Sequence, residues 1–361
     1  MKGNNHKTNH ITFFAETNFR NVRRKFGIKL ADRRRHIYVL GKSGVGKSTL
    51  LLNMAVSDIR AGLGLALIDP HGDLVESILD DIPLSRIKDV IYFNPADVEY
   101  PIAFNVLESV SPVQRPLVAS GLISVFKKIW SEFWGPRLEY VLRNAILALL
   151  EREGSTLLDL PRLLTDEDFR AGITPTITDP VVKSFWETEY EKYPKVFRTE
   201  TISPIQNKIG QYLSSFLIRN IVGQRENRFN LREVIDTGRI LLVNLSKGAI
   251  GEDNAALLGS LLVTKLYLAG LSRVDMPESR RPYFSLFVDE FQDFATQSFA
   301  NILSESRKYN LGLTITNQHL SVVNPICQDT FRLLFVCGFE SQILLDFCNP
   351  KPNGGSSGCN L

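Results

Sequence analysis

The sequence predicts an α/β protein with a mostly parallel sheet and an inserted all-α domain. Short, nearly continuous apolar runs alternate with helical patterns near both ends of the chain, as in parallel sheets buried on both faces. Between them, long helical patterns interrupted by prolines extend from about residue 111 to residue 230. We expect a core built from segments 1–110 and 231–348, an all-α insertion at 111–230, and a disordered tail at 349–361.

The apolar runs of the core can be assigned one by one. In the first segment we expect strands at His36–Leu40, Gly64–Asp69 and Val90–Phe93, with a helix from about Ser48 to Ala61. In the second segment we expect strands at Ile240–Leu245, Tyr283–Asp289, Leu311–Thr316 and Leu333–Cys337. All are short enough for strands and rich in β-branched and aliphatic residues.

Bulk composition is that of an ordinary globular protein. Hydrophobic residues make up 44% and charged residues 22% of the 361-residue chain, which argues against a disordered or fibrous protein. The formal net charge of +3 is compatible with a polyanionic partner but does not require one. The chain has no run of about 18 apolar residues and its polar N-terminus lacks a signal peptide, so we expect a cytoplasmic location and no transmembrane segment.

Two other features call for structural interpretations. A strand starting at Ile11 leads into a basic stretch that includes Arg20, Arg23, Arg24, Lys25, Arg33, Arg34 and Arg35. We expect a solvated loop and strand edge there, with a surface that contacts phosphates or a subunit as the alternative. The four cysteines (Cys327, Cys337, Cys348 and Cys359) form no CxxC pair, which favours reduced thiols over a zinc site.

A glycine-rich loop supplies the strongest functional signal. Residues Gly41–Ser48 match G-x-x-x-x-G-K-[ST] between the first core strand and its helix, which predicts a RecA-like P-loop core that binds ATP. Lys47 would reach the β- and γ-phosphates, and the Ser48 hydroxyl would ligate Mg²⁺. Backbone N–H groups would surround the phosphates. The candidate ATP-binding positions are Gly41, Ser43, Gly44, Val45, Gly46, Lys47, Ser48 and Thr49.

An acidic pair after a later strand is the matching half of such a site. Four largely apolar residues precede Asp289 and Glu290, so both acids would emerge where a parallel sheet places its ligands. Asp289 would hold the Mg²⁺ shell, and Glu290 would act as general base toward the attacking water. A second acid next to the first favours hydrolysis over nucleotide storage.

Several polar residues accompany these motifs. The strand at Leu311–Thr316 would deliver Asn317 and Gln318 beside the acids, where an amide can orient water or sense the γ-phosphate; an ordinary polar strand end is the alternative. Arg307 could serve as an arginine finger in a neighbouring subunit, or be a solvated surface arginine. Asp69 or Asp73 could support the Mg²⁺ water shell, and His71 is a weaker base candidate than Glu290.

Taken together, these motifs resemble the HerA/FtsK branch of P-loop ATPases. The likeness is strongest to conjugative coupling proteins of type IV secretion systems (TraG/TraD-like) and runs from about Phe26 to Gln318. It is carried by FGIKLADRRRHIYVLGKSGVGKST, LALIDPHGDL, FVDEFQDF and SRKYNLGLTITNQ. The helical stretch between the second and third motifs is similar to the all-α domain that such proteins insert into the motor core.

The resemblance implies a ring, usually a hexamer, that moves DNA and binds ATP with Mg²⁺ between subunits. It implies that Gln318 is a sensor glutamine and Arg307 a trans-acting arginine. It also implies a secretion-channel or relaxase-type partner, through which the chain could lie at the inner membrane. The function expected first is therefore an ATP-driven DNA translocase; a nucleotide-gated scaffold that recruits a protein substrate, or an inactive truncated relative, are the alternatives.

Overall fold

The computed structural model describes residues 10–17, 20–108, 110–296, 306–318 and 332–335. These residues confirm the α/β prediction with a seven-stranded sheet in the order β5-β6-β4-β7-β8-β3-β9, in which every neighbouring pair is parallel. The strands are β3 (Ile37–Leu40), β4 (Gly64–Asp69), β5 (Val90–Phe93), β6 (Ile240–Asn244), β7 (Phe284–Val288), β8 (Leu311–Asn317) and β9 (Arg332–Phe335). Their carboxyl ends share one edge, where open α/β sheets bind ligands.

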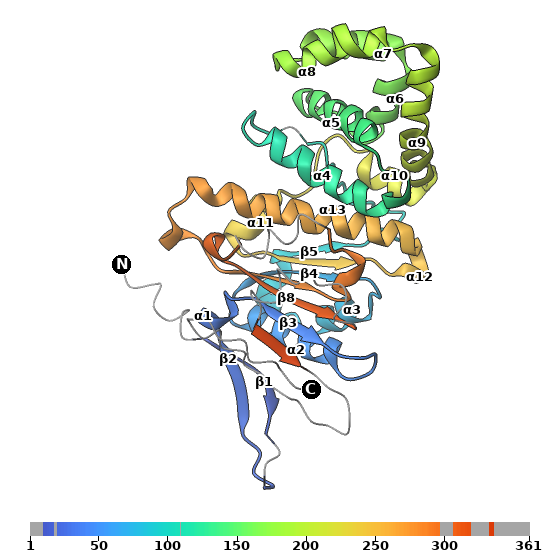
Figure 1. The fold of residues 1–361 in the computed structure, drawn as a ribbon. Helices are drawn as coiled ribbons and strands as arrows, with labels where there is room; N and C mark the ends of the chain where they lie inside the picture. Colours follow the sequence, from blue (N-terminus) through green and yellow to red (C-terminus); the bar gives the residue numbers. More distant parts are fainter. Residues whose placement is uncertain (1–9, 18–19, 109, 297–305, 319–331, 336–361) are drawn as a thin grey trace, which may run out of the picture.

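Helices cover both faces of this sheet (Figure 1). Because successive residues of a strand point to opposite faces, Leu65 and Leu67 of β4 pack toward α2 (Lys47–Arg60) and α3 (Asp73–Asp80), in one core. Ala66 and Ile68 pack in the other core, with α11 (Leu231–Thr237) and α13 (Glu252–Leu271). A short α12 (Lys247–Ile250) joins β6 to α13.

A layer of helices stacks on α13, as Figure 1 shows. These helices lie between β5 and β6 in the chain, where an all-α insertion was expected. They are α4 (Arg115–Ile129), α5 (Pro136–Glu151), α6 (Asp159–Thr165), α7 (Glu167–Ile173), α8 (Pro180–Ser184), α9 (Lys195–Ser214) and α10 (Phe216–Val222). The apolar core is continuous from the sheet through α13 into this layer. The domain limits at 111 and 230 stay a prediction.

The N-terminal segment corrects one expectation. Where one strand and a basic loop were predicted, β1 (Ile11–Glu16) and β2 (Lys25–Lys29) form an antiparallel hairpin outside the main sheet, and α1 (Leu30–Arg33) follows. The alternating burial of Phe26 and Ile28 reveals β2, but the basic residues around them mask the pattern in the sequence. The hairpin projects away from the helical layer (Figure 1).

The basic stretch had indicated a solvated surface or a phosphate contact, but Arg33 is buried. Its side chain is 1% exposed and makes a two-pronged ion pair with Asp58 of α2, at 2.5 and 2.8 Å. Its guanidinium also donates to Thr12 Oγ1 at 2.9 Å and Ser285 Oγ at 3.1 Å. Burial is tolerated because the charge is paired and hydrogen-bonded. The network ties the hairpin to α2 and β7.

Some predictions concern residues outside the described part of the chain. These are the four cysteines, the tail 349–361, and Val336 and Cys337 at the end of the last predicted strand.

One helix among the described residues, Glu252–Asp275, is long and apolar enough to cross a membrane. However, 67% of its most apolar window is buried within the protein.

Candidate ATP-binding and hydrolysis site

The P-loop has the backbone shape that phosphate binding requires. It leaves β3, turns through Gly44 and Gly46 with φ of +80° and +94°, and enters α2 at Lys47. Residues that carry a Cβ are strained at such φ values, whereas glycine adopts them readily. The Gly41 N–H donates to the Asn317 carbonyl at 3.1 Å, which fastens the loop to the end of β8. The free N–H groups at the start of α2 and its positive dipole end favour an anion there.

Lys47 and Ser48 lie directly against the acidic pair. Lys47 is 5% exposed; its Nζ donates to the Lys42 carbonyl at 3.2 Å and lies 3.6 Å from Glu290 Oε1. Ser48 Oγ donates to Asp289 Oδ2 at 3.3 Å. Two motifs separated by 241 positions therefore meet at one point. The hydroxyl and carboxylate are hard oxygen ligands that suit Mg²⁺, which also keeps waters and phosphate oxygens in its shell.

Asp289 is positioned by the strand on either side of it. Its N–H continues the ladder to Ile68 of β4 at 3.0 Å, and its Oδ1 accepts from the hydroxyl of Thr316 on β8. Burial raises the pKa of the Asp289 carboxyl, the Thr316 hydrogen bond opposes this, and the charges of Asp69 and Glu290 add to it. A carboxylate with a raised pKa gains from a nearby cation, because the cation favours its ionised form.

Glu290 has a left-handed backbone with φ of +45°, an unfavourable conformation for a side chain that carries a Cβ. Its N–H donates to Thr316 Oγ1 at 3.0 Å, and its carboxylate accepts from Gln318 Nε2 at 2.9 Å and from Gln292 Nε2. Burial by itself would raise the pKa of Glu290, but the two amide hydrogen bonds and the charge of Lys47 lower it below its usual value. Glu290 is therefore ionised, as a general base must be.

Gln292 and Thr316 are functional candidates that the sequence interpretation missed. They lie within the motifs FVDEFQDF and SRKYNLGLTITNQ, in which only Asp289, Glu290, Arg307, Asn317 and Gln318 were predicted to have roles. Gln292 follows Glu290 by two positions and reaches back to it because the chain turns at once into η8 (Phe291–Asp293). Of the amides expected beside the acids, Asn317 is internal: it is fully buried, accepts from Gln292 N–H and donates to Tyr38.

Asp69, the acid at the end of β4, has a structural role. Asp69 accepts from the backbone N–H groups of His71, Leu74 and Val75 at 2.9 to 3.2 Å, and is 1% exposed. Its carboxylate therefore caps the start of α3, where it offsets free N–H groups and the helix dipole. Asp73 lies in the first turn of α3 and is exposed, and His71 lies on the wall of the cavity described next.

These residues surround one cavity of about 360 Å³ at the carboxyl edge of the sheet. It is lined by Ser43, Gly44, Gly46, Lys47, Ser48, Thr49, His71, Asp289, Glu290 and Gln318. Gly41 and Val45 are P-loop positions that do not line it: Gly41 holds the loop to β8, and Val45 packs against the core beneath α2. Among the described residues, no group of three or more His, Cys, Asp or Glu has the arrangement to hold a metal ion by itself, and a P-loop Mg²⁺ needs none.

Residues 25–331, well over half of the 361-residue chain, match the family model described as the type IV secretion-system coupling protein DNA-binding domain. The chain belongs to this family. A search of curated proteins returned no match.

Solved structures of a coupling protein and of VirB4 have a similar fold. The bacterial conjugative coupling protein TrwBdeltaN70 has a TM-score of 0.61 at 18% identity, covering 86% of this chain and 71% of that one. TrwB in complex with ADP and Mg²⁺ has a TM-score of 0.59 at 19% identity, covering 86% and 72%. VirB4 of Thermoanaerobacter pseudethanolicus has a TM-score of 0.51 at 14% identity, covering 91% and 82%. At these identities the likeness concerns the fold.

In this member of the coupling-protein family, Arg307 is not near the cavity of its own chain. It lies exposed in η9 (Ser306–Tyr309), immediately before β8 begins, whereas Gln318 follows the end of β8. A seven-residue strand is about 20 Å long. Arg307 therefore lies at the opposite edge of the sheet, away from the cavity around Lys47.

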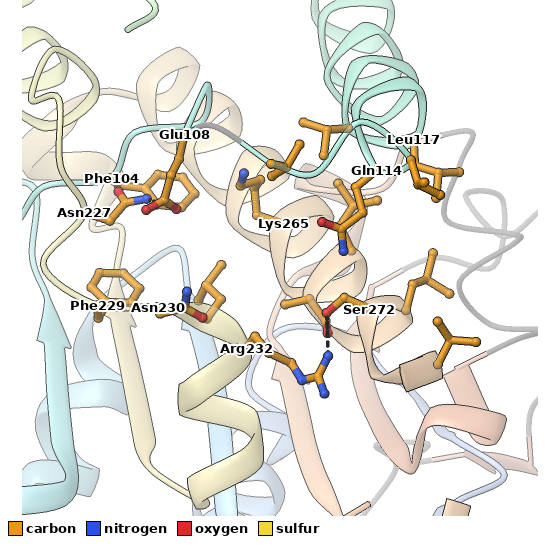
Figure 2. Close-up of a pocket in the computed structure, with 18 residues that line it drawn as sticks. Phe104, Glu108, Gln114, Leu117, Asn227, Phe229, Asn230, Arg232, Lys265 and Ser272 are labelled. Atoms are coloured by element: carbon orange, nitrogen blue, oxygen red, sulfur yellow. Dashed lines mark hydrogen bonds between the residues drawn. The ribbon is translucent and has the colours of Figure 1, made fainter. Parts of the chain in front are cut away.

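A second cavity, of about 270 Å³, lies between the sheet core and the helical layer of the coupling-protein chain (Figure 2). Side chains of α4, α11 and α13 line it, among them the apolar Leu117 and the ammonium of Lys265. It shares no residue with the P-loop cavity, so it is not part of the ATP site. It is mostly apolar, unlike the polar site around Lys47.

Proposed function

We propose that this chain is a Mg²⁺-dependent ATPase that drives DNA transfer as the motor of a type IV secretion coupling protein. The observation that carries the proposal is the convergence of Lys47, Ser48, Asp289, Glu290 and Gln318 on one cavity. A cation, a hydroxyl, two acids and an amide at that spacing are what nucleotide hydrolysis needs. We infer DNA as the substrate from membership in the coupling-protein family, whose model is described as a DNA-binding domain.

Each residue has a part in the reaction. The P-loop N–H groups and Lys47 bind and orient the phosphates, and Ser48 and Asp289 would hold Mg²⁺, which would supply charge neutralisation on the phosphate oxygens. Glu290, ionised and facing the cavity, accepts a proton from the attacking water. Gln318 holds Glu290 by its amide and orients that water. The catalytic residues of the chain's own half-site are therefore Glu290 and Gln318.

The site is completed by a second copy of the chain. Arg307 lies at the sheet edge opposite its own ATP cavity, so a ring of copies arranged head to tail would bring it to a neighbour's phosphates. There its guanidinium would stabilise charge that develops in the transition state. A hexamer with ATP at each subunit interface is the assembly we propose, with a secretion-channel or relaxase-type protein as partner.

Steady-state ATPase rates with and without DNA, for the natural chain and for Glu290→Gln, test this function. We expect DNA to raise the rate, with less stimulation as salt increases, because binding to phosphates releases counterions. Glu290→Gln should abolish the rate while nucleotide still binds. A Glu290-dependent rate that ignores DNA would reject the translocase and favour a nucleotide-gated scaffold.

A further inference from the structure

The loop that carries Glu290 is fastened at its far end by the helical layer. Lys128, near the end of α4, reaches across to η8 and donates from Nζ to the Asp293 carbonyl at 2.5 Å and the Gln292 carbonyl at 3.4 Å. α4 lies in the inserted helices, and Asp289 and Glu290 join β7 to η8. The Lys128 contact therefore joins an inserted helix to the turn that carries Glu290.

Other contacts show that this turn is held from both sides. Within it, the Asp293 N–H donates to the Glu290 carbonyl at 3.0 Å, so that residues 290–293 close a single turn. Lys247 of α12 pairs with the Asp293 carboxylate at 2.7 Å. The Gln292 N–H donates to Asn317 at 3.0 Å, which fastens the turn to β8. Lys128 is the part of this network contributed by the inserted helices.

The backbone of Glu290 explains why such fastening matters. A left-handed φ at a residue with a Cβ is strained and persists only where the surroundings impose it. If the turn is loosened, Glu290 can relax toward ordinary backbone angles, and its carboxylate would leave the place where Lys47 and Gln318 meet it. Misplacing a catalytic group by about 1 Å can lower a rate by about 100-fold.

We infer that Lys128 is a positioning residue for hydrolysis, through which the inserted helices hold the Glu290 turn in its working conformation. This inference rests on the proposed hydrolytic role of Glu290. Lys128 does not line the ATP cavity, so it acts through the Glu290 turn rather than on bound nucleotide. The Lys128 contact couples the two parts mechanically. A displacement of α4 would shift the carbonyls of Gln292 and Asp293, and with them Glu290.

The variants Lys128→Met, Lys128→Arg and Lys127→Met separate this role from general packing. Methionine keeps most of the side-chain volume and removes the donor, whereas arginine restores donors and charge. Lys127 is the neighbouring lysine on α4; it is exposed and lies 3.9 Å from Glu139 in a surface pair. It is the matched control, because it lacks any described contact with η8.

Steady-state kinetics give the first measurement. Lys128→Met should lower kcat by about 10-fold to 100-fold with KM changed less than about twofold, because the P-loop is untouched. Lys128→Arg should recover most of kcat, and Lys127→Met should equal the natural chain. A Lys128→Met enzyme with natural kcat, or one whose KM rises in step with the loss of kcat, would overturn the inference.

Hydrogen exchange of the peptide covering residues 289–294, with a non-hydrolysable ATP analogue bound, gives a measurement independent of turnover. We expect at least about tenfold faster exchange in Lys128→Met and no change in Lys127→Met, while the P-loop amides keep their protection. Unchanged exchange at 289–294 would refute the positioning role. If the natural chain did not hydrolyse ATP, the proposed function would fail, and the exchange result would still decide whether Lys128 holds the turn.

Discussion

Gln318 Nε2 donates to Glu290 Oε1 at 2.9 Å, and Lys47 Nζ lies 3.6 Å from the same oxygen. The proposed base is thus held between the amide of Gln318, which follows β8, and the ammonium of Lys47 in the P-loop. The other carboxylate oxygen accepts from Gln292, so Glu290 is fixed at both oxygens. This arrangement predicts which substitutions affect chemistry and which affect binding.

Replacing Gln318 by alanine should lower kcat by about 10-fold or more, because one of the two amides that hold Glu290 is lost. ATP affinity should stay within about threefold, since Lys47 and the P-loop keep their geometry. Single-turnover kinetics and equilibrium binding of a fluorescent ATP analogue measure the two quantities. Equal losses in binding and turnover would show that Gln318 contributes to the ground state instead.

Replacing Ser48 by alanine should raise the Mg²⁺ concentration needed for half-maximal ATPase activity by about tenfold or more, because the hydroxyl opposite Asp289 is removed. A Mg²⁺ titration at saturating ATP measures this. Ser77→Ala is the control: Ser77 is exposed on α3, and its hydroxyl donates to the Asp73 carbonyl. An unchanged Mg²⁺ requirement in Ser48→Ala would reject Ser48 as a ligand.

The Arg33–Asp58 pair predicts a large effect on stability. Arg33→Met should lower the free energy of unfolding by about 3–5 kcal/mol, because Asp58 would remain buried without its partner. Arg60→Met is the matched control: its pair with Asp81 has side chains 62% and 44% exposed, and its loss should cost less than about 1 kcal/mol. Urea titrations followed by tryptophan fluorescence compare the two. Similar losses in both variants would contradict the assigned role of burial.

The lowered pKa of Lys128 predicts that kcat depends on pH in the alkaline range. Burial lowers the pKa of Lys128 to about 8, with the charge of Asp293 opposing the shift. The protonated form that holds the turn is therefore lost as pH rises through about 8, and kcat should fall there. The Asp293 carboxylate of η8 is the charge that acts on Lys128. Asp293 is itself paired with Lys247 of α12, and Glu252 of α13 lies 4.0 Å from Lys247.

The same experiment on Lys128→Arg supplies the comparison. Arginine stays charged throughout this range, so its kcat profile should remain flat up to at least about pH 9.5. An identical alkaline fall in both proteins would assign the titration to another group.

The position of Arg307 predicts complementation between two defective chains. Arg307→Ala and Glu290→Gln should each be inactive alone, but a mixture should recover activity. A mixed interface can combine an intact Glu290 from one copy with an intact Arg307 from the next. Lys47→Ala mixed with Glu290→Gln is the control and should recover nothing, since both residues belong to the same half-site. A mixture that stays inactive would argue that Arg307 does not act in trans.

The local sequence determined the elements of the site. The run from His36 to Ser48 encodes strand, turn and helix, because apolar β-branched residues, glycines and an amphipathic pattern each restrict the nearby backbone. The same holds for β7 and the two acids that follow it. The order of the motifs along the chain also predicts a helical insertion where the structure has it, between β5 and β6.

The tertiary structure alone decided which charges are buried and which residues hold the base. Arg33 stands among solvated arginines in the sequence, yet it is buried because Asp58 and Ser285, far along the chain, are brought to it. Lys128 is one of two adjacent lysines, and only the packing of α4 on α13 brings it to η8. Local patterns encode backbone geometry, whereas a partner 165 positions away is set by the sheet order and the helical packing, which no short window of sequence contains.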